Sequence, residues 1–185
     1  MKQAYIVTES ESTAEILKKL LPKNLIRSIA FIAGSGDYSA WSKAGTLLFV
    51  KHLPVALVIN THTVNDSNVR EKVGSLRELI LPRPAGVRFE IFPAVPEIET
   101  VFFQDRRFIE KLAKKTFTDM EWNFAKLNPK EALTYLLGNS APLNSKILPK
   151  LTDETIRVLQ QHALLANLSE FLSSVLESNK FAKAA

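Results

Sequence analysis

Short apolar runs alternate with helix-like patterns along the first half of the chain. Four segments read as strands: residues 4–7 and 55–59 are continuous apolar runs, and residues 28–33 and 87–92 are also rich in β-branched or aromatic residues. Between them, apolar residues recur at helical spacing over about residues 12–22, 39–51 and 69–80. Strands separated by helices need parallel crossover connections, and strands this apolar are covered on both faces. The pattern therefore predicts an α/β fold with a four-stranded, mainly parallel sheet flanked by helices.

The second half of the chain shows only helical patterns, over about residues 98–115, 129–137, 152–162 and 168–180. We expect an α/β core over residues 1–105 and a helical extension over residues 106–185 that packs on the core. Two start signals refine these helices. Ser12 and Glu15 have the spacing of a capping box, and Asn128 precedes Pro129 as a cap would.

Composition excludes several classes of protein. With 46% apolar residues among 185, the chain has enough hydrophobic surface to offset its ordering entropy, which a disordered chain lacks. The absence of Cys excludes disulfides, thiolate zinc sites and a cysteine nucleophile. No apolar run is long enough to span a membrane, and the first residues lack the apolar core of a signal peptide. We therefore expect a cytoplasmic protein without a membrane partner.

The net charge of +5 permits an anionic partner without naming one. A basic balance indicates nucleic-acid contact when the charges gather on one face. Here the basic residues are scattered, which favours ordinary solvated helix faces and leaves nucleic acid open as a partner.

Polar residues follow all four predicted strands. Ligands of open parallel sheets bind beyond the carboxyl ends of the strands, so these residues are the candidates for a site. They are Glu9 and Glu11 after the first strand, Gly34, Gly36 and Asp37 after the second, Asn60, His62 and Asp66 after the third, and Glu97 and Glu99 after the fourth. Carboxylates gathered at one edge are what Mg²⁺ requires.

The succession of these segments resembles TOPRIM domains, which are found in topoisomerases, primases and nucleases of the overcoming-lysogenization-defect (OLD) type. Residues 5–14 (YIVTESESTA) look like the opening strand and glutamate motif, and residues 34–40 (GSGDYSA) are similar to the glycine-containing turn of small stand-alone TOPRIM-like proteins. Residues 56–63 (ALVINTHT) stand where that family has a strand ending in Asp-x-Asp. Residues 92–99 (FPAVPEIE) resemble the Pro-Glu-x-Glu segment of the OLD-related branch. The resemblance covers about residues 4–105 and implies a TOPRIM/Rossmann-like fold and a role in DNA processing or phage defence.

The chain departs from the TOPRIM pattern at the metal ligands. Glu9 matches the family's glutamate, but Ser10 follows it where glycine is usual. Asn60 and His62 stand at the two aspartate positions. Losing two carboxylates weakens a Mg²⁺ site, and two-metal phosphodiester chemistry becomes difficult. The resemblance with these departures implies a degenerate site and no resident cofactor.

Alternatives remain open at this edge of the sheet. Glu9 could act as the catalytic residue if another carboxylate replaced the charge of the two absent aspartates. The candidates are Glu11, Asp66, Glu97 and Glu99, and Mg²⁺ or Mn²⁺ would then be the cofactor. An imidazole at His62 suits Mn²⁺ or Zn²⁺ better than Mg²⁺. Gly34 and Gly36 could cradle a phosphate, but without a third glycine or a following lysine they favour a tight strand-to-helix turn.

Three functions follow from the sequence. The leading hypothesis is a TOPRIM-like protein without catalysis, which binds nucleic acid or a protein partner. The second is a Mg²⁺- or Mn²⁺-dependent nuclease that uses Glu9. The third is a structural subunit or homo-oligomer, in which the helical half forms the contact surface.

Overall fold

A four-stranded parallel sheet forms the centre of the protein. The computed structural model describes residues 2–80 and 86–184. The strands are β1 (Ala4–Thr8), β2 (Ile29–Ala33), β3 (Val55–Asn60) and β4 (Phe89–Ala94), in the spatial order β2-β1-β3-β4. All neighbouring pairs are parallel, which confirms the predicted α/β sheet. The fourth strand lies two residues later than predicted, because Phe89 pairs with Val55 and Ala94 with Asn60.

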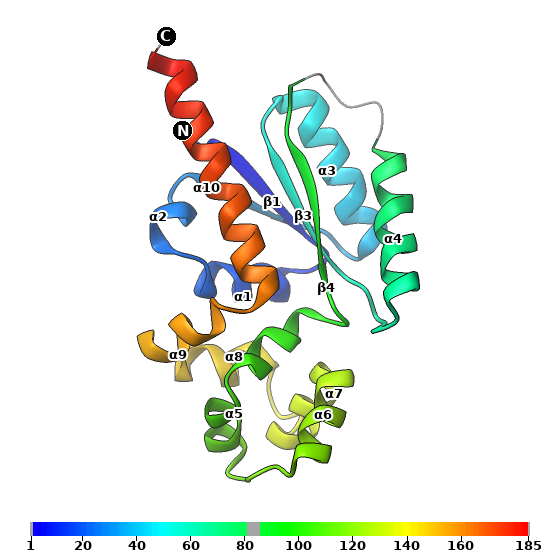
Figure 1. Ribbon diagram of the computed structural model, residues 1–185, viewed down its shortest axis with the longest axis vertical. Coiled ribbons are helices and arrows are strands. Elements are labelled where there is room, and N and C mark those ends of the chain that lie inside the picture. The colour runs from blue at the N-terminus through cyan, green and yellow to red at the C-terminus, as the bar shows by residue number, and fades with distance from the viewer. Residues whose placement is uncertain (1, 81–85, 185) are drawn as a thin grey trace.

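Helices cover both faces of the sheet (Figure 1). On one face lie α1 (Glu11–Leu20), α2 (Lys23–Ile26) and α10 (Ala163–Ala184); on the other lie α3 (Asp37–Lys51) and α4 (Asp66–Leu79). Side chains alternate along a strand, so Val58 is buried with the first group and Leu57 with the second. Coverage on both faces explains why β1 and β3, the two central strands, are almost entirely buried.

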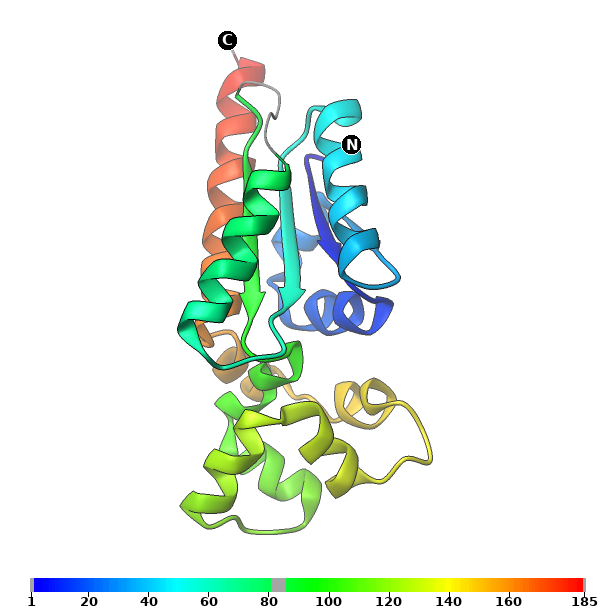
Figure 2. The ribbon, with the colours of Figure 1, turned by 90° about the vertical axis from the view of Figure 1, so that its right-hand side faces the viewer.

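The remaining helices form a lobe beyond the carboxyl ends of the strands, as the arrowheads in Figure 2 show. This helical lobe, residues 98–159, consists of the 3₁₀ helix η1 (Ile98–Gln104), α5 (Arg106–Ala113), α6 (Asp119–Leu127), α7 (Pro129–Leu137), α8 (Leu143–Ile147), the 3₁₀ turn η2 (Leu148–Lys150) and α9 (Asp153–Leu159). Trp122 anchors it through ring contacts with Phe103 and Phe117, at centroid distances of 5.1 and 5.7 Å.

The chain returns from the lobe to the sheet through α10, which packs on β4 (Figure 1). The rings of Phe92 and Phe171 meet edge to face at 5.5 Å, and the Arg88 guanidinium lies 5.0 Å from the Phe171 centroid. Within residues 2–80 and 86–184, no helix combines the length and the apolar character that crossing a bilayer needs.

Several predicted helix boundaries are wrong. The helix expected over 98–115 is broken at Asp105, whose carboxylate accepts a hydrogen bond from the Phe108 N–H and starts α5. The helix α6 was not predicted, although Thr118 and Glu121 form a capping box at its start. Ser10, rather than Ser12, caps α1. Asn128 stands at the cap of α7 without a side-chain hydrogen bond.

The turn between β2 and α3 depends on two glycines. The Gly34 N–H donates to the Thr8 carbonyl at 2.7 Å, and the Gly36 N–H donates to the Glu9 carbonyl at 2.8 Å. A Cβ at Gly34 would lie 2.7 Å from the Ala40 backbone nitrogen, and Gly36 has a φ of 109°. The tight-turn interpretation of these glycines is therefore confirmed, and the turn brings the start of α3 against the end of β1.

We predict that Gly34→Ala lowers the free energy of unfolding by about 2–3 kcal/mol, because the new methyl group meets rigid backbone. Gly45→Ala is the matched control, since Gly45 lies inside α3 with open space around its Cα. Helix propensity should make that variant more stable by about 0.5–1 kcal/mol. Urea denaturation measures both changes. Equal stability of Gly34→Ala and the wild type would contradict the close approach.

Candidate functional site

Three of the predicted site residues meet at the carboxyl edge of the sheet. Glu9 follows β1, Asp37 begins α3, and His62 follows β3. A ligand atom from each lies within 4.8 Å of the ligand atoms of the other two, and no other such group occurs in the part of the chain that the structure describes. Parallel pairing produces this meeting, because it brings every strand's carboxyl end to the same edge.

Glu9 is the buried member of this group. Its side chain is 7% exposed, and its Oε1 atom has no hydrogen-bond partner among the described residues. Burial raises the pKa of Glu9 to about 8, and the neighbouring Asp37 carboxylate adds to the rise. Glu9 therefore holds a proton at neutral pH.

Lys72 neutralises the second carboxylate. Its ammonium group, on α4, lies 2.6 Å from Oδ2 of Asp37 and 2.8 Å from the backbone carbonyl oxygen of Asn60. Burial works against ionisation of Asp37, but the hydrogen bond from Lys72 and the interaction with Glu9 outweigh it, so the pKa of Asp37 is lowered. The result is an ionised pair beside a protonated acid.

The sequence analysis did not identify Lys72. The available signal was its place in the helical pattern. Lys72 lies three residues after Val69 and next to Val73, so it borders the apolar stripe of α4. A lysine beside such a stripe needs a partner, and the polar edge of the sheet supplies it.

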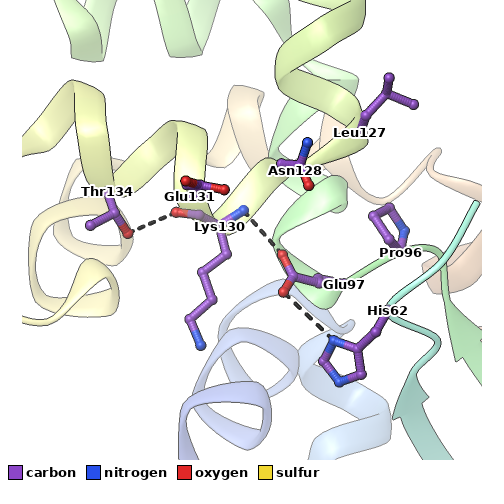
Figure 3. A pocket seen from close by; sticks show the side chains of 8 residues that line it. All are labelled: His62, Pro96, Glu97, Leu127, Asn128, Lys130, Glu131 and Thr134. Atoms are coloured by element: carbon purple, nitrogen blue, oxygen red, sulfur yellow. Dashed lines mark hydrogen bonds and ion pairs between the residues drawn. The ribbon is translucent and has the colours of Figure 1, made fainter.

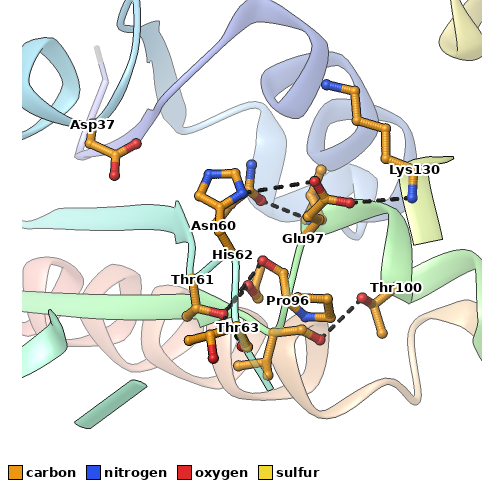
Figure 4. A network of polar contacts seen from close by, with 12 residues as sticks. Asp37, Asn60, Thr61, His62, Thr63, Pro96, Glu97, Thr100 and Lys130 are labelled. Carbon is orange, nitrogen blue, oxygen red and sulfur yellow. Dashed lines mark hydrogen bonds and ion pairs between the residues drawn. The ribbon is translucent and has the colours of Figure 1, made fainter. Parts of the chain in front are cut away.

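Backbone and side-chain hydrogen bonds join the ends of β3 and β4 (Figure 4). The Asn60 side-chain oxygen accepts from the Ile98 N–H at 2.8 Å, which ties β3 to the start of η1. The N–H groups of Thr61 and His62 both donate to the Pro96 carbonyl, at 3.0 and 2.9 Å. His62 adopts a left-handed conformation with φ 56°, which turns the chain at this point.

A pocket of about 360 Å³ lies beside this network, between the β3 and β4 loops and the lobe (Figure 3). Glu97 crosses it, accepting from the Lys130 backbone N–H at 3.3 Å and lying 3.8 Å from Nδ1 of His62. The lining residues are His62, Pro96, Glu97, Leu127, Asn128, Lys130, Glu131 and Thr134. Glu97 thus lines the pocket and lies next to His62, but it is not a member of the Glu9–Asp37–His62 group.

The other predicted carboxylates lie outside the Glu9–Asp37–His62 group. Asp66 is exposed at the start of α4, and Glu11 is exposed and pairs with Lys18 at 3.0 Å. Glu99 is buried in η1, where burial raises its pKa. Of the candidate metal ligands, the structure therefore brings Glu9 together with Asp37 and His62, which the sequence had indicated for binding.

The chemistry of its three side chains determines which metal ions the group could bind. Two carboxylates and one imidazole form a mixed oxygen and nitrogen set, which suits Mn²⁺ or Zn²⁺ better than Mg²⁺. Metal binding would require Glu9 to lose its proton and Asp37 to exchange Lys72 for the ion. As it stands, the Lys72 ammonium group occupies the Asp37 carboxylate that an ion would need.

Comparisons with known proteins find no matching family model, no matching curated protein and no matching solved structure.

We predict that Glu9 makes the protein less stable as pH rises from about 4.5 to about 8. The folded-state pKa lies above that of the unfolded chain, so the folded state binds the proton more tightly in this window. Below about pH 4.5 Glu9 is protonated in both the folded and the unfolded protein, so it costs no stability. Above about pH 8 it is ionised in both, and the folded protein bears the full cost of burying the charge. Glu9→Gln removes the titration, so its stability relative to the wild type should be about 2–4 kcal/mol greater at pH 9 than at pH 4.

Urea denaturation of both proteins between pH 4 and pH 9 measures this difference. Using the difference removes the contribution of titrating groups that do not contact Glu9, such as Glu99, and leaves that of Glu9 with its neighbour Asp37. A difference that stays constant across the range would contradict a buried proton on Glu9.

Proposed function

We propose that this chain is a TOPRIM-like protein with a degenerate metal site, which binds nucleic acid without cleaving it. The observation that carries the proposal is the position of Lys72, whose ammonium group contacts Asp37 and the carbonyl oxygen of Asn60. A fixed monovalent cation thus stands among the acids where a metal-dependent nuclease needs a divalent ion.

The electrostatics of the edge support the absence of cleavage. Mg²⁺ prefers anionic oxygens, but Glu9 holds a proton and Asp37 is already paired. Asn60 and His62 occupy the positions of the resembled Asp-x-Asp motif and bring no negative charge of their own. An added divalent ion would also be repelled by the nearby ammonium group.

The charge of the chain supports nucleic acid as the partner. The net charge of +5 gives a favourable, salt-dependent interaction with phosphates. The resemblance to TOPRIM domains implies a role in DNA processing or phage defence. The expected compartment is the cytoplasm, because the sequence shows no membrane-spanning run and no signal-peptide core. A protein partner is the competing form of the same binding hypothesis.

We predict affinity for DNA without turnover. Fluorescence anisotropy with a labelled duplex of arbitrary sequence should show binding whose affinity falls steeply between about 50 and 200 mM salt. A supercoiled plasmid incubated with the protein and Mg²⁺ or Mn²⁺ should stay intact. Nicking that depends on the metal and disappears in Glu9→Gln would overturn the proposal in favour of a nuclease. If the protein neither binds the duplex nor nicks the plasmid, the result would favour a protein partner or a structural subunit.

One observation favours the nuclease as the second candidate function: the ligand atoms of Glu9, Asp37 and His62 lie within 4.8 Å of one another. In that case Glu9 and Asp37 would hold the ion and position it against a phosphate, with His62 as the third ligand.

Removing Lys72 distinguishes the two candidates. If its ammonium group takes the place of a metal, Lys72→Met should bind Mn²⁺ at least 10-fold more tightly than the wild type in calorimetry, because Asp37 is freed and the repulsion is gone. Lys18→Met, which removes the surface pair with Glu11, is the matched control and should bind as the wild type does. Tight Mn²⁺ binding by the wild type, unchanged in Lys72→Met, would contradict the replacement.

A further inference from the structure

A second and larger cavity lies in the helical lobe, and it shares no lining residue with the Glu9–Asp37–His62 group. It is a groove of about 890 Å³ between α5 and the η2–α9 segment, which lie on the same side of the lobe in Figure 1. We call it the α5–α9 groove. Its charged lining residues that have no side-chain partner among the described residues are Arg107, Lys111, Lys114, Lys150 and Glu154.

Two of the charged lining residues already have structural partners. Arg106 donates to Glu110 at 3.0 Å and to Asp119 at 2.7 Å. The Asp105 carboxylate accepts from the Phe108 N–H at 3.0 Å as the cap of α5. These residues stabilise the wall of the groove and are not available to a ligand.

The groove also holds cations without partners. Arg107, Lys111, Lys114 and Lys150 form no side-chain hydrogen bond or ion pair with any residue that the structure describes. The one lining acid in the same condition is Glu154, at the start of α9. Four unpaired cations against one unpaired carboxylate make the groove strongly positive.

The cations have a regular arrangement. Arg107 and Lys111 are spaced i and i+4, so they lie along one side of α5, and Lys114 follows as the residue that ends the helix and also lines the groove. At 1.5 Å per residue this row is about 10 Å long. Lys150, on η2, faces it from the opposite wall.

Lys114 occupies a position where glycine is the usual residue. It is the C-cap of α5, with φ 53°, and its N–H donates to the Glu110 carbonyl. The left-handed conformation is unfavourable for a side chain with a Cβ atom. This placement puts a cation at the end of the row.

We propose that the α5–α9 groove binds the phosphate backbone of a nucleic-acid strand. The inference rests on the proposed nucleic-acid binding and names the surface that performs it. A duplex carries one negative charge per about 1.7 Å of its axis when both strands are counted. An extended acidic peptide presents side chains to one face only at every second residue, about 6.7 Å apart. The duplex therefore offers the unpaired cations of the groove the denser negative charge.

The lining also indicates how the strand is bound. The aromatic residue of the groove, Phe108, is buried and offers no face on which a base could stack. The contacts are therefore made to phosphates, and the groove does not distinguish one sequence from another.

The test compares groove variants with a control that removes one exposed cation outside the groove, all in the 185-residue chain. Lys111→Gln/Lys150→Gln removes one cation from each wall, and Lys114→Gly removes the cation at the left-handed position while relieving its backbone conformation. Lys51→Gln is the control, because Lys51 is exposed at the far end of α3 from the carboxyl edge. Fluorescence anisotropy with a labelled 20-base-pair duplex of arbitrary sequence measures affinity across a salt series.

We expect the double variant to lose at least 10-fold in affinity at low salt and Lys114→Gly at least 3-fold, with Lys51→Gln unchanged. The slope of log K against log salt should become shallower by about 0.9 for each phosphate that the variant no longer neutralises. Urea denaturation should show Lys114→Gly to be at least as stable as the wild type, so that its weaker binding cannot come from unfolding.

The outcomes separate the groove from the proposed function. If every variant binds the duplex as the wild type does, the groove inference is wrong and nucleic-acid binding stands on another surface. If the wild type does not bind the duplex, both proposals fail. A labelled 15-residue polyglutamate peptide then serves as the second probe, and binding that the groove variants abolish would identify an acidic protein as the occupant.

Discussion

Asn60 holds the carboxyl edge of the sheet together through two of its oxygen atoms. The side-chain oxygen fixes the start of η1 through the Ile98 N–H, and the backbone carbonyl receives Lys72 from α4. Losing the side-chain oxygen would leave the Ile98 N–H without this acceptor, whereas Lys72 would keep its bond to Asp37. The residue that stands where the TOPRIM resemblance expects an aspartate is thus also the link between β3, the helical lobe and α4.

The charges of the protein are distributed unequally between the sheet edge and the lobe. At the edge, burial of Glu9 and the pairing of Asp37 with Lys72 leave an arrangement with little net charge. In the lobe, Arg107, Lys111 and other cations of the α5–α9 groove have no such partners among the described residues. Metal-dependent chemistry would need free carboxylates at the sheet edge, whereas binding of a polyanion needs free cations, which the α5–α9 groove has. The proposed function, nucleic-acid binding without cleavage, agrees with this distribution of charge.

The sheet could be predicted from the sequence because its signals are local. Continuous apolar runs such as residues 55–59 mark strands that are buried on both faces, and glycines such as Gly34 mark the turn. The lobe was harder, because its helices are short and their ends are set by single capping residues such as Asp105. Within the site, Glu9 and His62 were visible as strand-end residues. The role of Lys72 was not, because it depends on a contact with Asp37, 35 residues away in sequence.

The path of the chain gives the lobe two attachments to one strand. It leaves the sheet from the end of β4 and returns through α10, which packs against β4 through Phe92 and Phe171. A third attachment joins the lobe to α1, because the Asn144 side chain donates hydrogen bonds to the Ser12 carbonyl and to the Glu15 carboxylate. The separation between the α5–α9 groove and the sheet edge is therefore set by the fold itself, so a ligand held in the groove lies at a set distance from Glu9 and Asp37.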